Sequence, residues 1–166
     1  MTVIGMDNGR EEPKMKRIVL FATLLGVVAG TVWAADDLSG MSPEQVVSYR
    51  QDAFHEFKEN SGMLRSMLKD KSKWDQAAAQ GYVSALEQAS DRAFAAFLPG
   101  TAVGESEALP RIWEEPELFK QAQGNFKEAL ANVKMAVDKN DPDLAAKDVA
   151  GLGRACKSCH DGFRQP

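Results

Sequence analysis

The apolar residues of this chain recur every three or four positions in four separate stretches after residue 40. None of the stretches shows the strict alternation of apolar and polar residues that is typical of a half-buried β-strand. A spacing of three and four places side chains on one face of an α-helix, which has 3.6 residues per turn. Capping residues and prolines mark four helix starts, at 42–43, 72–75, 115–117 and 141–142. The pattern therefore predicts an all-α fold.

Short connections between most of these stretches favour antiparallel neighbours, so we expect an up-down four-helix bundle. Helices of such a bundle cross at about 20°, and binding sites lie between facing helices. The length of 166 residues suits one domain, and 44% apolar residues exclude a disordered chain. A net charge of −4, without any basic run, makes nucleic acid an unsuitable partner.

The N-terminal segment is typical of a secretory signal peptide. A basic start at 15–17 (Met-Lys-Arg) is followed by an uncharged, mainly apolar run at 18–30 and by small residues at Ala34 and Ala35. The residues before Met15 fit neither a signal nor a domain, which indicates Met15 as the start. The run is shorter than the roughly 20 residues that span a bilayer, although an uncleaved anchor is the alternative. We expect residues 1–34 to be removed, leaving residues 35–166 as an exported domain without a membrane segment.

The residues with the most specific chemistry lie near the C-terminus, in the motif Cys156-Lys157-Ser158-Cys159-His160. A Cys-x-x-Cys-His motif is typical of c-type haem attachment. On a helix, positions 156, 159 and 160 share one face, so two thiols and one imidazole point the same way. Such a face suits one covalent haem c, held by two thioethers and by the histidine as the axial iron ligand.

The motif has three alternative interpretations besides haem attachment. A disulfide or a thioredoxin-like redox pair would suit an exported protein, but the sequence has no βαβ pattern. A zinc site needs about four ligands, whereas the chain has two cysteines and two histidines, one of them distant at position 55. Chance occurrence is the third. Haem attachment accounts best for an exported chain in which both cysteines and the adjacent histidine are used.

Arg50 stands in line with the apolar stripe of the first helix, four residues after Val46 and four before Phe54. An inward-facing guanidinium needs an anion, because burial of an unpaired charge costs several kcal/mol. No acidic residue on the facing stripes is an obvious mate, so a haem propionate is the expected partner. The alternative is an arginine whose stem is buried while its charged end reaches the bundle rim.

Taken together, the sequence resembles the cytochrome c′ family, the class II c-type cytochromes, over residues 38–166. The resemblance depends on the segments 49–51 (Tyr-Arg-Gln) and 112–113 (Ile-Trp), and on 156–164 (Cys-Lys-Ser-Cys-His-Asp-Gly-Phe-Arg) at the end of the last helix. It implies a periplasmic homodimer with five-coordinate, high-spin iron that binds nitric oxide and carbon monoxide or transfers electrons. The redox partner is not identified by the sequence.

The resemblance also implies roles for individual residues. Cys156 and Cys159 match the thioether cysteines, His160 matches the proximal ligand, and Arg50 matches the residue that meets a propionate. Arg164 matches an arginine beside the proximal histidine, and its spacing of four from His160 agrees with that place. A solvated terminal arginine is the alternative for Arg164.

On the opposite side of the iron, the family has an apolar residue of the first helix, which Phe54 matches. A phenyl ring offers no lone pair to iron, so the sixth position would stay open, with Phe57 lining the same pocket. The alternative is a low-spin, six-coordinate relative that only carries electrons. Met63 lies too far along the helix to be its ligand, and His55 lies about 100° around the helix from Phe54. No catalytic constellation is evident, so we do not expect an enzyme.

Overall fold

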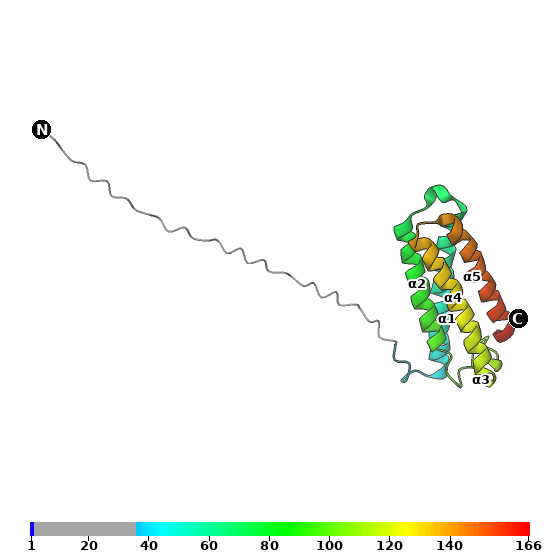
Figure 1. The fold of residues 1–166 in the computed structure, drawn as a ribbon. Coiled ribbons are helices and arrows are strands. Elements are labelled where there is room, and N and C mark those ends of the chain that lie inside the picture. Colours follow the sequence, from blue (N-terminus) through cyan, green and yellow to red (C-terminus); the bar gives the residue numbers. More distant parts are fainter. Residues whose placement is uncertain (2–35) are drawn as a thin grey trace. The chain divides into compact units, whose positions relative to one another are not determined.

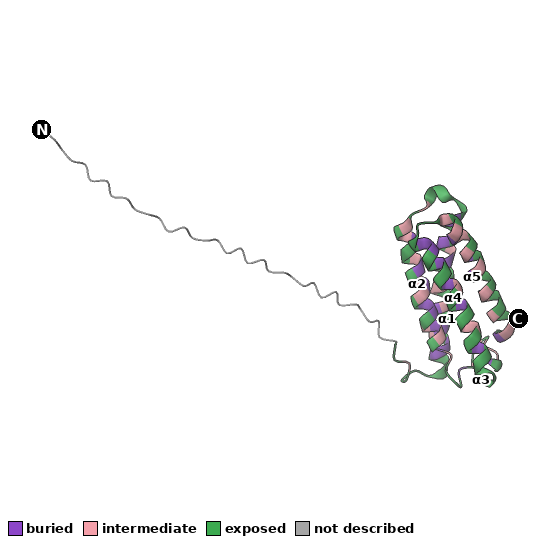
Figure 2. Ribbon diagram, in the orientation of Figure 1, coloured by how far each residue is buried: buried purple, intermediate pink, exposed green. Residues whose placement is uncertain are grey.

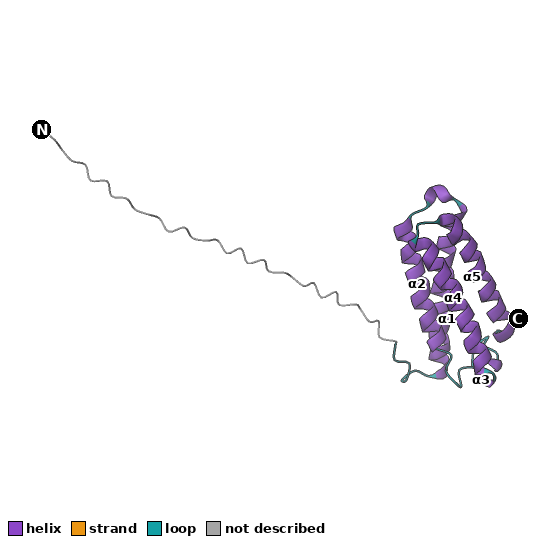
Figure 3. Ribbon diagram, viewed as in Figure 1, coloured by secondary structure: helices purple, strands orange, loops and turns teal. Residues whose placement is uncertain are grey.

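Four long helices make up most of the structure, a computed structural model that describes Met1 and residues 36–166. They are α1 (Pro43–Lys69), α2 (Gln76–Ala95), α4 (Pro116–Asp138) and α5 (Pro142–Phe163). Figures 1 and 3 show them side by side in a bundle. The expected all-α four-helix bundle is thus confirmed. Apart from Met1, the predicted signal peptide lies outside the described residues, and within these no helix is both long and apolar enough to cross a membrane.

Three of the four long helices start at a capping side chain, and α4 starts at Pro116 without one. Ser42 forms a capping box with Gln45, whose backbone N–H donates to Ser42 Oγ while Ser42 N–H donates to Gln45 Oε1 at 2.8 Å. Asp75 and Asp141 cap α2 and α5 by accepting hydrogen bonds from the backbone N–H groups three residues later. These bonds satisfy N–H groups that lack a partner inside the helix, which is why short polar residues fix helix starts.

The helices pack around a square in the order α1, α2, α4, α5. The pairs α1–α2 and α4–α5 are the most extensive, whereas α1 and α5 approach each other least closely of the four sides. The aliphatic core fills the half of the bundle where α1 ends and α5 begins, and its largest fully buried members are Leu64, Val83, Leu86, Val133 and Val137. Figure 2 shows buried residues on the inner faces of the helices. Packing is therefore tight at one end, and the α1–α5 side is open at the other.

Two short elements were not expected from the sequence. A 3₁₀ turn, η1 (Lys71–Lys73), follows α1, and a single helical turn, α3 (Arg111–Glu114), precedes α4. The α3 turn buries Ile112 and lets Trp113 Nε1 donate to the carbonyl of Phe97 at 3.2 Å. One turn is too short to show a helical period, and only its packing against the bundle makes it stable.

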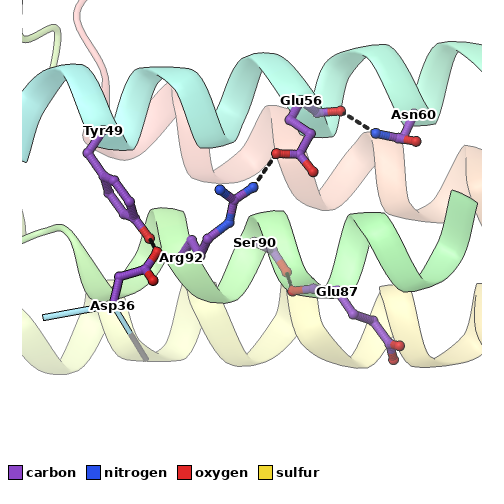
Figure 4. Close-up of polar contacts among 7 residues, drawn as sticks. All are labelled: Asp36, Tyr49, Glu56, Asn60, Glu87, Ser90 and Arg92. Carbon is purple, nitrogen blue, oxygen red and sulfur yellow. Dashed lines mark hydrogen bonds and ion pairs between the residues drawn. The ribbon is translucent and has the colours of Figure 1, made fainter. Parts of the chain in front are cut away.

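A polar network joins α1 to α2 away from the cavity described below (Figure 4). Tyr49 donates its hydroxyl to Asp36 Oδ2 at 2.5 Å, and Arg92 of α2 pairs with Glu56 of α1. Burial of the phenol, together with the neighbouring Asp36 carboxylate, raises the pKa of Tyr49 to about 12. The tyrosine therefore stays protonated at neutral pH and ties the segment before α1 to the bundle.

Candidate functional site

A cavity of about 600 Å³ lies where α1 and α5 separate. All four long helices and the loop at 106–108 contribute to its wall. Small-molecule sites have volumes of roughly 300–1,000 Å³ and are concave, mainly apolar and few per protein. The open side of the bundle is thus large enough for a cofactor.

All seven phenylalanines of residues 36–166 line this cavity. Their rings form one connected network of tilted and edge-to-face pairs with centroids 4.9–6.4 Å apart, the geometry that aromatic quadrupoles favour. Two of these residues were predicted from the sequence as pocket residues, and the other five were assigned only to helix faces. The members are Phe54, Phe57, Phe94, Phe97, Phe119, Phe126 and Phe163.

Cys156, Cys159 and His160 all lie on the cavity wall, as neighbours on one side of α5. Both thiols are free and half-buried, and burial raises the pKa of each. The pKa of His160 is lowered, first because part of its ring is removed from water and second because Arg164 is positively charged. A neutral imidazole is the form that binds a metal, so both effects favour ligation.

Arg50 is buried in the cavity wall, and four of its five N–H donors have oxygen partners. Its NH1 donates to the carbonyl of Ala96 and to Thr101 Oγ1, and its NH2 to the carbonyl of Thr101 and to Ser106 Oγ, at 2.9–3.3 Å. The guanidinium also lies over the ring of Phe97, 4.4 Å from its centroid. The argument that burial of Arg50 requires an anion is therefore wrong, because neutral loop oxygens satisfy it. Its contact with a propionate stays a prediction.

Arg164 lies on the cavity wall close to His160, and its partner is Glu107. Both Nε and NH2 of Arg164 lie 2.5 Å from Glu107 Oε2. No local pattern predicts this pair, because the two residues lie 57 positions apart. The predicted place of Arg164 beside His160 thus includes a carboxylate that opposes its charge, which was not predicted.

The two residues weighed as iron ligands from α1 lie away from the cavity interior. The side chain of His55 is 68% exposed at the cavity edge, with Nδ1 3.6 Å from Glu59 Oε1. Met63 is 56% exposed, and no methionine of residues 36–166 lines the cavity. Phe54, in contrast, lines the cavity and packs against Phe94 and Phe97. The α1 wall thus presents a phenyl ring in the interior.

The residues present fit a haem. The apolar wall suits a porphyrin ring, and its charged residues are four cations and one carboxylate, which suits a group with two propionates. A Cβ atom on Gly153, which lies on the wall one turn before Cys156, would meet no other atom within 4 Å. Within the described part of the chain, no cluster of three or more His, Cys, Asp or Glu residues could hold a metal ion directly. The charged members of the wall are Arg50, Lys58, Arg65, Glu107 and Arg164.

Comparison with known proteins gives consistent matches. The family model for cytochrome C′ matches residues 45–164. Cytochrome c′ of Alcaligenes xylosoxydans is 33% identical over 123 residues, which cover 74% of this chain and 95% of that protein. Cytochrome c-554 of Cereibacter sphaeroides is 32% identical over 157 residues, which cover 91% of this chain and 99% of that protein.

Solved structures match in the same way. The nitric oxide complex of a variant of cytochrome c prime from Alcaligenes xylosoxidans has a TM-score of 0.71 and 32% identity, covering 76% of this chain and 98% of that chain. Cytochrome c′ from Rubrivivax gelatinosus has a TM-score of 0.70 and 30% identity, covering 75% and 98%. Identity and fold therefore agree over nearly the whole length of these proteins.

Proposed function

The chain belongs to the cytochrome c′ family, so its cofactor is one covalent haem c, and we propose that it binds nitric oxide and carbon monoxide at an open axial position. The family membership confirms the resemblance found in the sequence. The observation that supports an open position most strongly is the α1 wall of the cavity, where Phe54 packs among other phenyl rings. A phenyl ring cannot ligate iron.

The attachment residues in this proposal are those of α5. Cys156 and Cys159 would form the two thioethers, and His160 would hold the iron through a ring nitrogen. When bound, the haem supplies an iron atom with an axial position for a small ligand. Burial around His160 lowers its pKa and so keeps the imidazole neutral, ready to ligate, at neutral pH.

Cations on the cavity wall provide the partners for the propionates. The Nε of Arg50 has no acceptor among the described residues, and its other donors already fix the guanidinium in place. A preorganised arginine loses little side-chain freedom when it binds a carboxylate. We therefore propose that Arg50 binds a propionate through its remaining donor, Nε.

The aromatic wall supports selection among gases. Phe54 and Phe57 offer no hydrogen-bond donor, so a polar bound ligand such as dioxygen gains nothing from them. Carbon monoxide and nitric oxide depend less on such a donor. A solved relative, a variant of cytochrome c prime from Alcaligenes xylosoxidans, is described as a nitric oxide complex. Apolarity and crowding would then exclude water and anions from the iron.

The cellular setting is part of the same proposal. The signal peptide that starts at Met15, removed with the rest of residues 1–34, would direct the domain at 35–166 to the periplasm. We propose a homodimer that exchanges electrons with a redox protein of that compartment and catalyses no reaction of its own. The full chain has an acidic net charge of −4, and removal of residues 1–34 leaves a slightly more acidic domain, which is compatible with free diffusion.

The absorption spectrum of the purified holoprotein tests this function. With five-coordinate iron, we expect a high-spin spectrum whose Soret band shifts when carbon monoxide is added to the reduced protein. A sharp low-spin spectrum that does not change when carbon monoxide is added would contradict the proposal. It would instead indicate a six-coordinate electron carrier.

Replacing Phe54 by alanine is expected to speed carbon monoxide binding to the reduced protein by about tenfold or more, which corresponds to a barrier lower by about 1.4 kcal/mol. The reason is that the phenyl ring occupies space on the α1 side of the cavity. Stopped-flow mixing measures the rate. Val47→Ala is the control, because Val47 is buried on the same helix but does not line the cavity. If both variants bound carbon monoxide at the same rate, Phe54 would not lie on the path that the ligand takes to the iron.

A further inference from the structure

Glu107 stands out on the cavity wall because it is the carboxylate among four cations. It belongs to the loop between α2 and α3, and it reaches the end of α5, where both Nε and NH2 of Arg164 lie 2.5 Å from its Oε2. Charge-assisted bonds of this length are stronger than neutral hydrogen bonds. The pair therefore sets the charge at the end of the cavity where His160 lies.

Backbone bonds hold this pair in place. The N–H of Gln165 donates to the carbonyl of Glu107 at 2.8 Å, and the N–H of Leu109 donates to the carbonyl of Phe163 at 3.0 Å. Ala108 and Arg164 form an isolated antiparallel bridge between the same two segments. Exposed ion pairs usually contribute little because two mobile side chains must be ordered. Here the two backbones are already joined, so less freedom is lost when the side chains pair.

Both charges act on His160. The backbone N–H of Arg164 donates to the carbonyl of His160 at 3.1 Å, and Glu107, His160 and Arg164 line the same cavity, so the imidazole lies beside the two opposite charges. Asp161 is the next residue after His160, but its carboxylate is paired with Lys157 at 2.6–2.8 Å. Glu107 is therefore the group that directly offsets the charge of Arg164 beside the imidazole.

We propose that Glu107 tunes the haem site by neutralising Arg164, and thereby keeps the reduction potential lower than Arg164 alone would set it. The inference rests on the proposed function, in which His160 is the axial ligand. Reduction adds one electron to the site, so a nearby cation favours the reduced form and a nearby anion opposes it. Removal of the Glu107 charge leaves the Arg164 charge uncompensated and favours reduction.

The test compares midpoint potentials of holoprotein variants by spectroelectrochemical titration at one fixed pH and ionic strength. Glu107→Gln keeps an oxygen acceptor for Arg164 but removes the charge. We expect it to raise the equilibrium constant for reduction about threefold, or about 28 mV at 59 mV per factor of ten. Glu107→Asp keeps the charge and should shift the potential less.

Glu105→Gln is the matched control, because it removes an exposed carboxylate of the same loop that forms no ion pair among the described residues. It should leave the potential close to that of the unmodified protein. Arg164→Gln should lower the potential, and the double variant Glu107→Gln/Arg164→Gln should return it towards the original value. A potential that Glu107→Gln leaves unchanged or lowers would overturn the inference.

The absorption spectra separate this failure from failure of the proposed function. If the unmodified protein lacks a haem spectrum, or if Arg164→Gln and Glu107→Gln change its axial ligation, the proposed ligand set is wrong. If all variants keep the original spectrum and differ by no more than Glu105→Gln does, only the role of Glu107 is wrong.

Discussion

Replacing both Cys156 and Cys159 by alanine is expected to leave a chain without covalently bound haem. The two thiols lie on the cavity wall, both are free, and the chain contains two cysteines in total. No other thiol can therefore form a thioether. Mass spectrometry of the exported protein after denaturation measures the loss directly, because a haem that is merely bound is released from the unfolded chain.

Ser158→Ala is the control for the cysteine variants, since Ser158 lies between the two cysteines and is exposed. This variant should retain the full haem mass. Each single cysteine variant should retain haem through one remaining bond. If the double variant kept its haem mass under denaturing conditions, the attachment site would lie elsewhere in the chain.

Replacing Arg50 by methionine is expected to lower the free energy of unfolding by about 2–5 kcal/mol. The substitution leaves the carbonyl oxygens of Ala96 and Thr101 without the guanidinium donors that they now have. Each buried polar group left without a partner costs about 1–3 kcal/mol. Thr101 and Ser106 keep other hydrogen bonds through their hydroxyl oxygens, which limits the loss. Urea unfolding of the holoprotein measures the change.

Arg92→Met is the matched control for Arg50, because Arg92 pairs with Glu56 across α1 and α2 while 37% of its side chain is exposed (Figure 4). Exposed ion pairs contribute about 0–1 kcal/mol, so the control should be much less destabilised. Equal effects of the two substitutions would mean that the loop at 96–106 does not depend on Arg50. A loss confined to Arg50→Met would identify this residue as the tie between α1 and that loop.

The fold was largely predictable from the sequence because its signals are local. Ser42, Asp75 and Asp141 cap helices through bonds to residues three positions later, so their effect is visible in a short window. The haem motif at 156–160 is local for the same reason, since one helical turn brings its three functional side chains together. The α3 turn was missed because four residues show no periodicity.

The surroundings of the site were less predictable. The sequence predicts an anion for Arg50, whereas its partners include the neutral oxygens of Thr101 and Ser106, which are 51 and 56 positions away and carry no charge that would mark them. Glu107 was missed because nothing in its neighbourhood marks it as a partner of Arg164. Five of the seven cavity phenylalanines were placed only on helix faces, because a core residue and a pocket residue have the same apolar pattern.

Local spacing in the sequence predicts the four helices, the caps of α1, α2 and α5, and the face on which two thiols and an imidazole meet. These depend on spacings of three to four residues, because side chains that far apart lie on the same face of an α-helix. The residues that surround that face come together through packing of the whole bundle: the phenyl network, the loop bound by Arg50, and the carboxylate opposite Arg164. Such contacts join distant segments, and their partners are chosen by how the helices pack rather than by any local pattern.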